Sequence, residues 1–354
     1  TGRLSSLLPQ SAGGVAPGRP KSLEGSQELF DFLERGDLDA VIVAFSDFEI
    51  SVLALDAMLR RKDRPINALI ASKEPMVVFG DYYRKMALNN GHRIIPLDSE
   101  PSALFQCLGG TLDADDRVDV MYLTASGGPF YKKIQNHHEI TPQMALKHPV
   151  WKMGQKITVD SATLLNKTLE LMEINNLFDF PCERIKIIVH PQCVVHSMLA
   201  MKNGSILAQM GPADMKIPIH YGLYWPDGFA TRNAVRPLDF TQGTTELTFD
   251  PPPLDKLPCL KFGLEVAHVA EDPRRMAARA ALLGADDAAV EKFLAGEIAF
   301  VEIAEILERT VARAWAYFSK DRQKSGGLLE RGIEIYRWAR HAARESAREA
   351  VLPQ

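Results

Sequence analysis

AVIVAF (Ala40–Phe45) is the first of three short apolar stretches, followed by INALIA (Ile66–Ala71) and RIIPL (Arg93–Leu97). Such runs are typical of strands that are buried on both faces. Helical patterns separate them, over Glu49–Arg61 and Glu74–Asn90. Buried strands that alternate with crossover helices predict a parallel sheet in an α/β protein.

The flanking sequence extends this pattern of strands and helices. Gln27–Arg35 reads as a helix, and Val118–Thr124 reads as a further strand. Three segments predict a second sheet: Ile185–Val189, Ser205–Met210 and Glu246–Phe249. We therefore expect four parts: a flexible segment 1–25, an incomplete Rossmann-like sheet domain 26–124, a central α/β catalytic domain 125–250 with a flap at 140–156, and a linker with a C-terminal α-helical domain 251–354.

Composition narrows the class of protein. The chain has 354 residues, 46% of them hydrophobic and 24% charged, with a formal net charge of -4. No apolar run approaches the roughly 20 residues of a membrane span, and no basic stripe favours a nucleic-acid partner. The cysteines are too scattered for a structural zinc site, which indicates reduced thiols in a cytosolic enzyme; they are Cys107, Cys182, Cys193 and Cys259.

Carboxylates follow the third predicted strand. In Asp98-Ser99-Glu100, alternation along an extended segment would send both acids to one side, where a cation could lie between them. With Glu170 they would supply three hard oxygen ligands, which suit Mg²⁺ or Mn²⁺. The alternative is an exposed acidic loop.

The stretch ITVDSATLLNKTLE (Ile157–Glu170) predicts a helix that Ser161 or Asp160 caps. Asn166 and Glu170 then share one face, with Lys167 beside them. Together with Ser126 and the glycines after it, this segment has the donors of a monophosphate pocket. A solvated helix face and an ordinary turn are the alternatives.

Four further residues are candidates for chemistry. Lys73 follows the second strand and could be a catalytic or substrate-binding ammonium, or a surface lysine paired with Glu74. His148 and His190 each precede a proline, and either could be catalytic or a structural histidine. Trp151 in the flap could exclude water from the site.

Six motifs, taken together, resemble the 1-deoxy-D-xylulose 5-phosphate reductoisomerase family from about Asp37 to Leu264. They are LIASKE, PLDSE, LTASGGPF, KHPVWKMGQKITVDSATLLNKTLE, IIVHPQCVVHSM and GSILAQMGPADMKIPI. The resemblance implies a metal-dependent rearrangement of 1-deoxy-D-xylulose 5-phosphate, followed by reduction with NADPH to 2-C-methyl-D-erythritol 4-phosphate, in non-mevalonate isoprenoid biosynthesis. It also implies a homodimer in the bacterial cytoplasm or in a plastid.

The resemblance assigns roles to individual residues. The metal ligands would be Asp98, Glu100 and Glu170. The catalytic residues would be Lys73, Glu100, His148 and His190. The substrate would be bound by Lys73, Ser99, Glu100, Ser126, His148, Trp151, Ser161, Asn166, Lys167 and Glu170. Ser72, Glu74 and Gly154 would contact NADPH.

The sequence departs from the family at its start. The family's Gly-Ser-Thr-Gly-Ser-Ile-Gly loop is absent. Gly13, Gly14 and Gly18 lie in a proline-rich segment that no predicted strand precedes. We therefore expect an unpaired sheet edge and weak NADPH binding. Two explanations stay open: a chain whose true N-terminus is not included, or a shortened relative that performs only the rearrangement. A non-catalytic sugar-phosphate binding protein is a third possibility.

Overall fold

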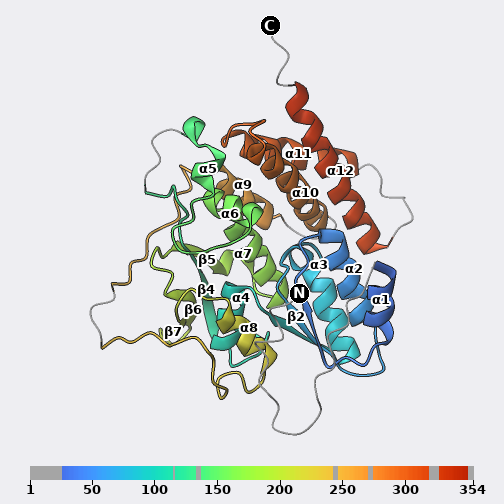
Figure 1. The fold of residues 1–354 in the computed structure, drawn as a ribbon, viewed down its shortest axis with the longest axis vertical. Helices are drawn as coiled ribbons and strands as arrows, with labels where there is room; N and C mark the ends of the chain where they lie inside the picture. Colours follow the sequence, from blue (N-terminus) through green and yellow to red (C-terminus); the bar gives the residue numbers. More distant parts are fainter. Residues whose placement is uncertain are drawn as a thin grey trace.

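The computed structural model describes residues 26–114, 116–132, 137–241, 246–269, 274–318 and 327–349. The predicted flexible segment 1–25 and its glycines lie outside these residues. Within them, the chain forms two separate sheets and a C-terminal group of helices (Figure 1). The predicted α/β class is confirmed.

The first sheet is parallel and has the strand order β1-β2-β3. Its strands are β1 (Ala40–Val43), β2 (Asn67–Ile70) and β3 (Arg93–Pro96), and the helices beside them are α1 (Ser26–Arg35), α2 (Phe48–Leu59) and α3 (Glu74–Asn90). These elements match the predicted ones closely, because each apolar run is punctuated by polar or glycine residues.

Burial differs between the strands of this sheet. The side chains of β2 are buried from Ala68 to Ile70, whereas only Val43 of β1 is buried and Ile42 is 37% exposed. The prediction that the first apolar run is a buried strand is therefore wrong for most of its length. Among the described residues β1 pairs only with β2, so the expected exposed sheet edge is present.

The second sheet is mixed, with the order β5-β4-β6-β7. It consists of β4 (Val118–Ala125), β5 (Ile185–Val189), β6 (Val195–Met201) and β7 (Ile206–Met210). Among the described residues β4 pairs with β5 and β6, so the strand predicted at Val118–Thr124 belongs to the second sheet and not to the first. Strand β6 was not predicted, because His196 and Ser197 interrupt its apolar pattern.

The predicted strand at Glu246–Phe249 is wrong. Only Asp250 forms a β-bridge, through two backbone hydrogen bonds with Val189 of 2.8 and 2.9 Å. Three prolines follow immediately at 251–253, and proline has no N–H with which to continue a ladder.

Helices complete the fold. The α-helices between β3 and the C-terminal group in sequence are α4 (Ser99–Cys107), α5 (Pro142–Ala145), α6 (Gln155–Thr163), α7 (Leu165–Leu177) and α8 (Lys216–Leu223). The C-terminal group contains α9 (Pro258–Ala267), α10 (Arg274–Leu294), α11 (Glu302–Phe318) and α12 (Leu328–Glu349), as predicted, and α10, α11 and α12 gather at one end of the molecule (Figure 1). No helix in the described ranges is both long enough and apolar enough to cross a membrane.

The helix predicted to begin at Asp160 or Ser161 is in fact two helices. Leu164 separates α6 from α7 and has a left-handed conformation, with φ of 57°. Asp160 and Ser161 therefore lie inside α6 and do not cap α7. The predicted face of α7 is nevertheless correct, because the Asn166 amide donates to Oε1 of Glu170 one turn later.

A close approach between α10 and α12 gives a test of the packing. A Cβ atom on Gly284 would lie 2.2 Å from the carbonyl oxygen of Tyr336 and 3.0 Å from the Arg340 nitrogen. Since these are backbone atoms, the helices must move apart, and we expect Gly284→Ala to lower the free energy of unfolding by about 1–3 kcal/mol. Urea denaturation measures this. Gly327→Ala is the control, because a Cβ there meets no atom within 4 Å; equal losses would contradict the packing argument.

Candidate active site

The site forms where β2 and β3 of the first sheet end. Lys73 follows β2 and begins α3, and Asp98 follows β3 and caps α4 by accepting from the Ser99 N–H at 3.0 Å. Ser99 and Glu100 are therefore helical, and the predicted extended alternation of Asp98 and Glu100 is wrong. Asp98 and Glu100 nevertheless lie close together, because Asp98 caps α4 and Glu100 is in its first turn.

Three carboxylates converge as predicted. One oxygen each from Asp98, Glu100 and Glu170 lies within 4.8 Å of the others. Glu170 is 1% exposed, and the other two are half-buried. The alternative of an exposed acidic loop is excluded by this burial.

Two lysines balance these acids. Lys73 Nζ lies 2.7 Å from Oδ2 of Asp98 and 2.9 Å from Oε1 of Glu170. Lys167 Nζ lies 2.6 Å from Oε1 of Glu100 and 2.5 Å from Oε2 of Glu170. Lys73 is 5% exposed, so the alternative of a surface lysine paired with Glu74 is wrong.

Burial and charge oppose each other at these groups. Burial alone would lower the pKa of Lys73, but attraction by Asp98 and Glu170 outweighs it and raises that pKa well above the usual value. Burial, with repulsion from Glu100, raises the pKa of Glu170 to about 7 despite both lysines. Burial would also raise the pKa of Glu100, but Lys167 lowers it. The lysines are thus charged, and Glu170 holds its negative charge less readily than Glu100 does.

The predicted phosphate-binding groups lie beside the acids. Ser126 Oγ accepts from the Gly128 N–H at 3.2 Å, and Gly128 has φ of 64°. A Cβ on Gly128 would lie 2.7 Å from the carbonyl oxygen of Ser161, so this glycine lets the turn touch the end of α6. Asn166 Oδ1 accepts from Lys73 at 2.8 Å, which connects these groups to the carboxylates.

One cavity of about 230 Å³ collects all the predicted catalytic, substrate-binding and metal residues. The predicted residues that line it are Lys73, Asp98, Ser99, Glu100, Ser126, His148, Trp151, Ser161, Asn166, Lys167, Glu170 and His190. The predicted NADPH contacts Ser72, Glu74 and Gly154 do not line it. Ser72 donates to the Phe45 carbonyl at 2.7 Å, and Gly154 is exposed at the start of α6.

His148 ties the flap to this cavity. Its Nδ1 accepts from the N–H groups of Val150 and Trp151 at 3.1 and 2.8 Å. Nδ1 therefore carries no proton, and Nε2–H donates to Ser126 Oγ at 3.0 Å. Burial, with repulsion from Lys167, lowers the pKa of His148. The neutral ring thus links Val150 and Trp151 of the flap to Ser126.

His190 is fully buried and has both ring nitrogens engaged. Nδ1–H donates to the Thr248 carbonyl at 2.8 Å, and Nε2 accepts from the Val194 N–H at 3.1 Å. The ring also stacks on Phe249 with centroids 4.7 Å apart. This arrangement favours the structural alternative for His190, since no ring nitrogen is available to transfer a proton.

Sequence reasoning missed several residues of the site. His196, Cys193 and Met215 line the cavity, and the His196 and Trp151 rings lie 6.2 Å apart. Glu173 is fully buried one turn after Glu170, and neither of its oxygens accepts a hydrogen bond within the described structure. Its spacing of three residues from Glu170 was the only signal, whereas His196 required knowledge that β6 reaches the site.

A second buried charge cluster holds α6 against α10. Lys156 Nζ lies 2.7 Å from Oδ2 of Asp160 and 2.6 Å from Oδ2 of Asp286. Burial and the repulsion between these acids raise the pKa of Asp160 well above its usual value, against the attraction of Lys156. Because Ser161 follows Asp160 in α6, this cluster fixes part of the candidate phosphate pocket. The same cluster gives Asp286 of α10 a packing role.

The fold and the site define an α/β protein with a buried, carboxylate-rich centre, and comparisons with known proteins identify its family. Residues 94–178 and 210–342 match the two models for the C-terminal domain of 1-deoxy-D-xylulose 5-phosphate reductoisomerase. The chain is 44% identical over 285 residues to the reductoisomerase of Clostridium perfringens, covering 80% of this chain and 71% of the relative. It is 37% identical over 324 residues to that of Ruminiclostridium cellulolyticum, covering 91% and 80%. The chain belongs to the 1-deoxy-D-xylulose 5-phosphate reductoisomerase family.

Solved structures support the same family assignment. A DOX-P reductoisomerase in complex with NADPH, fosmidomycin and magnesium has a TM-score of 0.83 at 33% identity, covering 93% of this chain and 81% of that one. The Zymomonas mobilis enzyme in complex with NADPH has a TM-score of 0.77 at 31% identity, covering 91% and 78%. The expectation of weak NADPH binding finds no support here, because both of these similar structures contain NADPH.

Removal of Lys156 tests the second cluster. Lys156→Met leaves Asp160 and Asp286 without their cation, and breaking a buried ion pair costs about 3–5 kcal/mol. Since a third of the Lys156 side chain is exposed, solvent screening should reduce this loss to about 2–3 kcal/mol in unfolding experiments. Lys85→Met is the control: Lys85 is 64% exposed beside Asp81, and its loss should cost less than about 1 kcal/mol. A similar small effect for both variants would show that the cluster contributes little.

The tautomer of His148 predicts a pH effect on the flap. Its folded-state pKa lies below the usual 6.5, so its contribution to stability is present above pH 6.5 and is lost as the pH falls through the folded-state value. Protonation of Nδ1 removes the acceptor for two backbone N–H groups, and we expect Trp151 fluorescence to change. The transition should vanish in Trp151→Phe and His148→Gln but persist in His196→Gln. Its persistence in His148→Gln would assign it to another group.

Proposed function

We propose that this reductoisomerase family member rearranges 1-deoxy-D-xylulose 5-phosphate and reduces the product with NADPH to 2-C-methyl-D-erythritol 4-phosphate, using the cavity described above. The convergence of Asp98, Glu100 and Glu170 beside Lys73 and Lys167 is the observation that supports this most strongly. A protein that only bound a phosphate would have no need of three carboxylates. The reaction itself is inferred from the family.

The three acids fit a divalent cation. Oδ2 of Asp98 and Oε2 of Glu170 are buried and accept no well-aligned hydrogen bond within the described structure, although lysine nitrogens lie close to them. Hard carboxylate oxygens with free valences suit Mg²⁺ or Mn²⁺. When bound there, the metal would act as a Lewis acid on the oxygens of the hydroxyketone.

The remaining residues would bind and orient the substrate. The hydroxyl groups of Ser126 and Ser161, the Asn166 amide and the Lys167 ammonium can surround the phosphate, and Ser99 with Lys73 can hold substrate hydroxyls. Lys167 would then exchange part of its interaction with Glu100 for the phosphate. Such an exchange is favourable only if a metal cation takes over the neutralisation of Glu100.

The flap would cover the bound substrate. His148 is already attached to Ser126, one of the phosphate-binding candidates, and its neutral ring positions Trp151 at the cavity. An indole ring there would exclude water from the reacting carbons. His190 would act by positioning: its two backbone hydrogen bonds connect the turn at residues 190–194 to Thr248.

NADPH would supply the reducing equivalents. A Cβ atom on Gly154 would meet no atom within 4 Å, so there is open space at the exposed N-terminus of α6. Backbone N–H groups at such a terminus suit an anionic cofactor. We propose Gly154 with Ser72 and Glu74 as the residues of this chain that contact NADPH.

A homodimer and a place in the bacterial cytoplasm are further proposals, supported by the family and by its bacterial relatives.

The Glu170→Gln variant tests the metal assignment. An outer-shell change at a metal site typically costs about 10–100-fold in affinity or activity, so loss of a direct ligand should weaken Mn²⁺ binding at least that much and abolish turnover. Mn²⁺ titration gives the affinity. Nicotinamide absorbance and sugar products, followed together with 1-deoxy-D-xylulose 5-phosphate, separate reduction from rearrangement.

Glu265→Gln, which alters an exposed acid on α9, is the control and should leave both quantities unchanged. Undiminished turnover in Glu170→Gln would refute the metal assignment. Rearranged product without consumption of NADPH in the unaltered protein would refute the reductase half of the proposal.

A further inference from the structure

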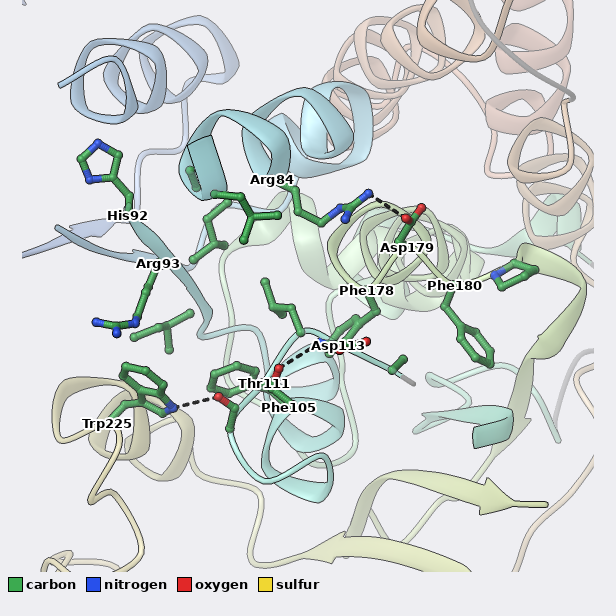
Figure 2. Close-up of a pocket in the computed structure, with 18 of the residues that line it drawn as sticks. Arg84, His92, Arg93, Phe105, Thr111, Asp113, Phe178, Asp179, Phe180 and Trp225 are labelled. Atoms are coloured by element: carbon green, nitrogen blue, oxygen red, sulfur yellow. Dashed lines mark hydrogen bonds and ion pairs between the residues drawn. The ribbon is translucent and has the colours of Figure 1, made fainter. Parts of the chain in front are cut away.

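A second, larger cavity of about 770 Å³ lies away from the active site. It opens between the C-terminal end of α3, the start of β3, the end of α4 and the segment after α7 (Figure 2). No residue lines both this cavity and the catalytic one. Its volume falls within the range of about 300–1,000 Å³ that is typical of small-molecule sites.

An arginine and an anchored aromatic ring form one side of the cavity. The Arg93 guanidinium lies over the Trp225 ring, 5.1 Å from its centroid (Figure 2). Trp225 Nε1 donates to the Gly110 carbonyl at 3.0 Å. Gly110 has φ of 81°, and a Cβ on it would lie 2.6 Å from Trp225 Nε1, so only glycine permits this contact. The ring that supports Arg93 is therefore held in place before any ligand arrives.

Arg93 differs from the other two arginines of the cavity. Arg84 pairs with Asp179 at 2.9 Å, and Arg184 donates to the Asp119 carbonyl at 2.8 Å. The Arg93 side chain is exposed. In the part of the chain that the structure describes, no carboxylate lies within ion-pair distance of its guanidinium group. Its guanidinium N–H groups are thus free to bind an anion in the bidentate manner that arginine favours.

The rest of the lining is mainly apolar. Hydrocarbon and aromatic side chains line the cavity, namely Ala87, Leu88, Ile94, Phe105, Leu112, Phe178 and Phe180. Leu88 is 68% exposed, which is unusual for a leucine that lines a concave surface. Asp113, Asp116 and Asp179 also lie at this cavity and would repel a ligand with several negative charges.

We propose that this cavity binds a small amphipathic organic anion. One carboxylate, sulfonate or phosphodiester group would pair with Arg93 over Trp225, and a flat apolar body would lie against Leu88 and the phenylalanines. The balance of three arginines and three aspartates selects a singly charged head group over a polyanion.

Fluorescence titration with 8-anilinonaphthalene-1-sulfonate, a flat apolar body with one sulfonate, tests the proposal on the folded protein. We expect one site, with affinity reduced at least about tenfold in Arg93→Gln, because a charge-assisted pair is lost. N-phenyl-1-naphthylamine, the uncharged probe of the same shape, should bind equally to both proteins. Arg274→Gln is the matched control, because Arg274 lies 4.5 Å over Trp315 outside the cavity.

A second variant keeps the test decisive if Arg93→Gln folds poorly. Leu88→Glu places a carboxylate at an exposed position of the cavity and should weaken the sulfonate probe while circular dichroism stays unchanged. The proposal is overturned if the unaltered protein binds no probe, if Arg274→Gln loses as much affinity as Arg93→Gln, or if Leu88→Glu binds the probe normally.

Discussion

The structure depends on the neutralisation of three acids that are crowded into one partly buried place. Asp98, Glu100 and Glu170 come from two helices, and they could not remain close together without Lys73 and Lys167 between them. Five charges are held within a few ångströms, so each element that carries one has a fixed position relative to the others. With all three acids ionised, the two lysines leave one negative charge in excess, and this excess supports the divalent cation that we propose for the centre.

The C-terminal helices support this centre without contributing to its chemistry. Arg279 of α10 is fully buried and donates to Asn176 and Asn175 at the end of α7, at 3.1 and 2.9 Å. Lys156 joins α6 to α10 through Asp160 and Asp286. Both helices that carry phosphate-binding candidates are therefore attached to α10. A change in α10 far from the substrate can for this reason alter the geometry of the site.

Local patterns were sufficient for most elements and insufficient where tertiary contacts override them. Glu74–Asn90 was predicted to the residue, because a buried strand, a proline near the start and Gly91 at the end all agree. The break at Leu164 was not predictable, since leucine rarely adopts a left-handed conformation. Strand β6 was missed because His196 and Ser197 interrupt its apolar pattern, and the supposed strand at Glu246–Phe249 has no partner along its length.

The kinds of residue at the site and their order can be read from the sequence, and so can the α/β class, because strand and helix periods are local properties. The sequence also carried the family resemblance through six motifs. The folded chain establishes which charges meet, which nitrogen of His148 holds the proton, that His190 is engaged on both sides, and that Arg93 lines a second cavity. The physical reason is that Coulomb attraction and desolvation depend on distance and burial, which residues far apart in sequence acquire only when the chain folds.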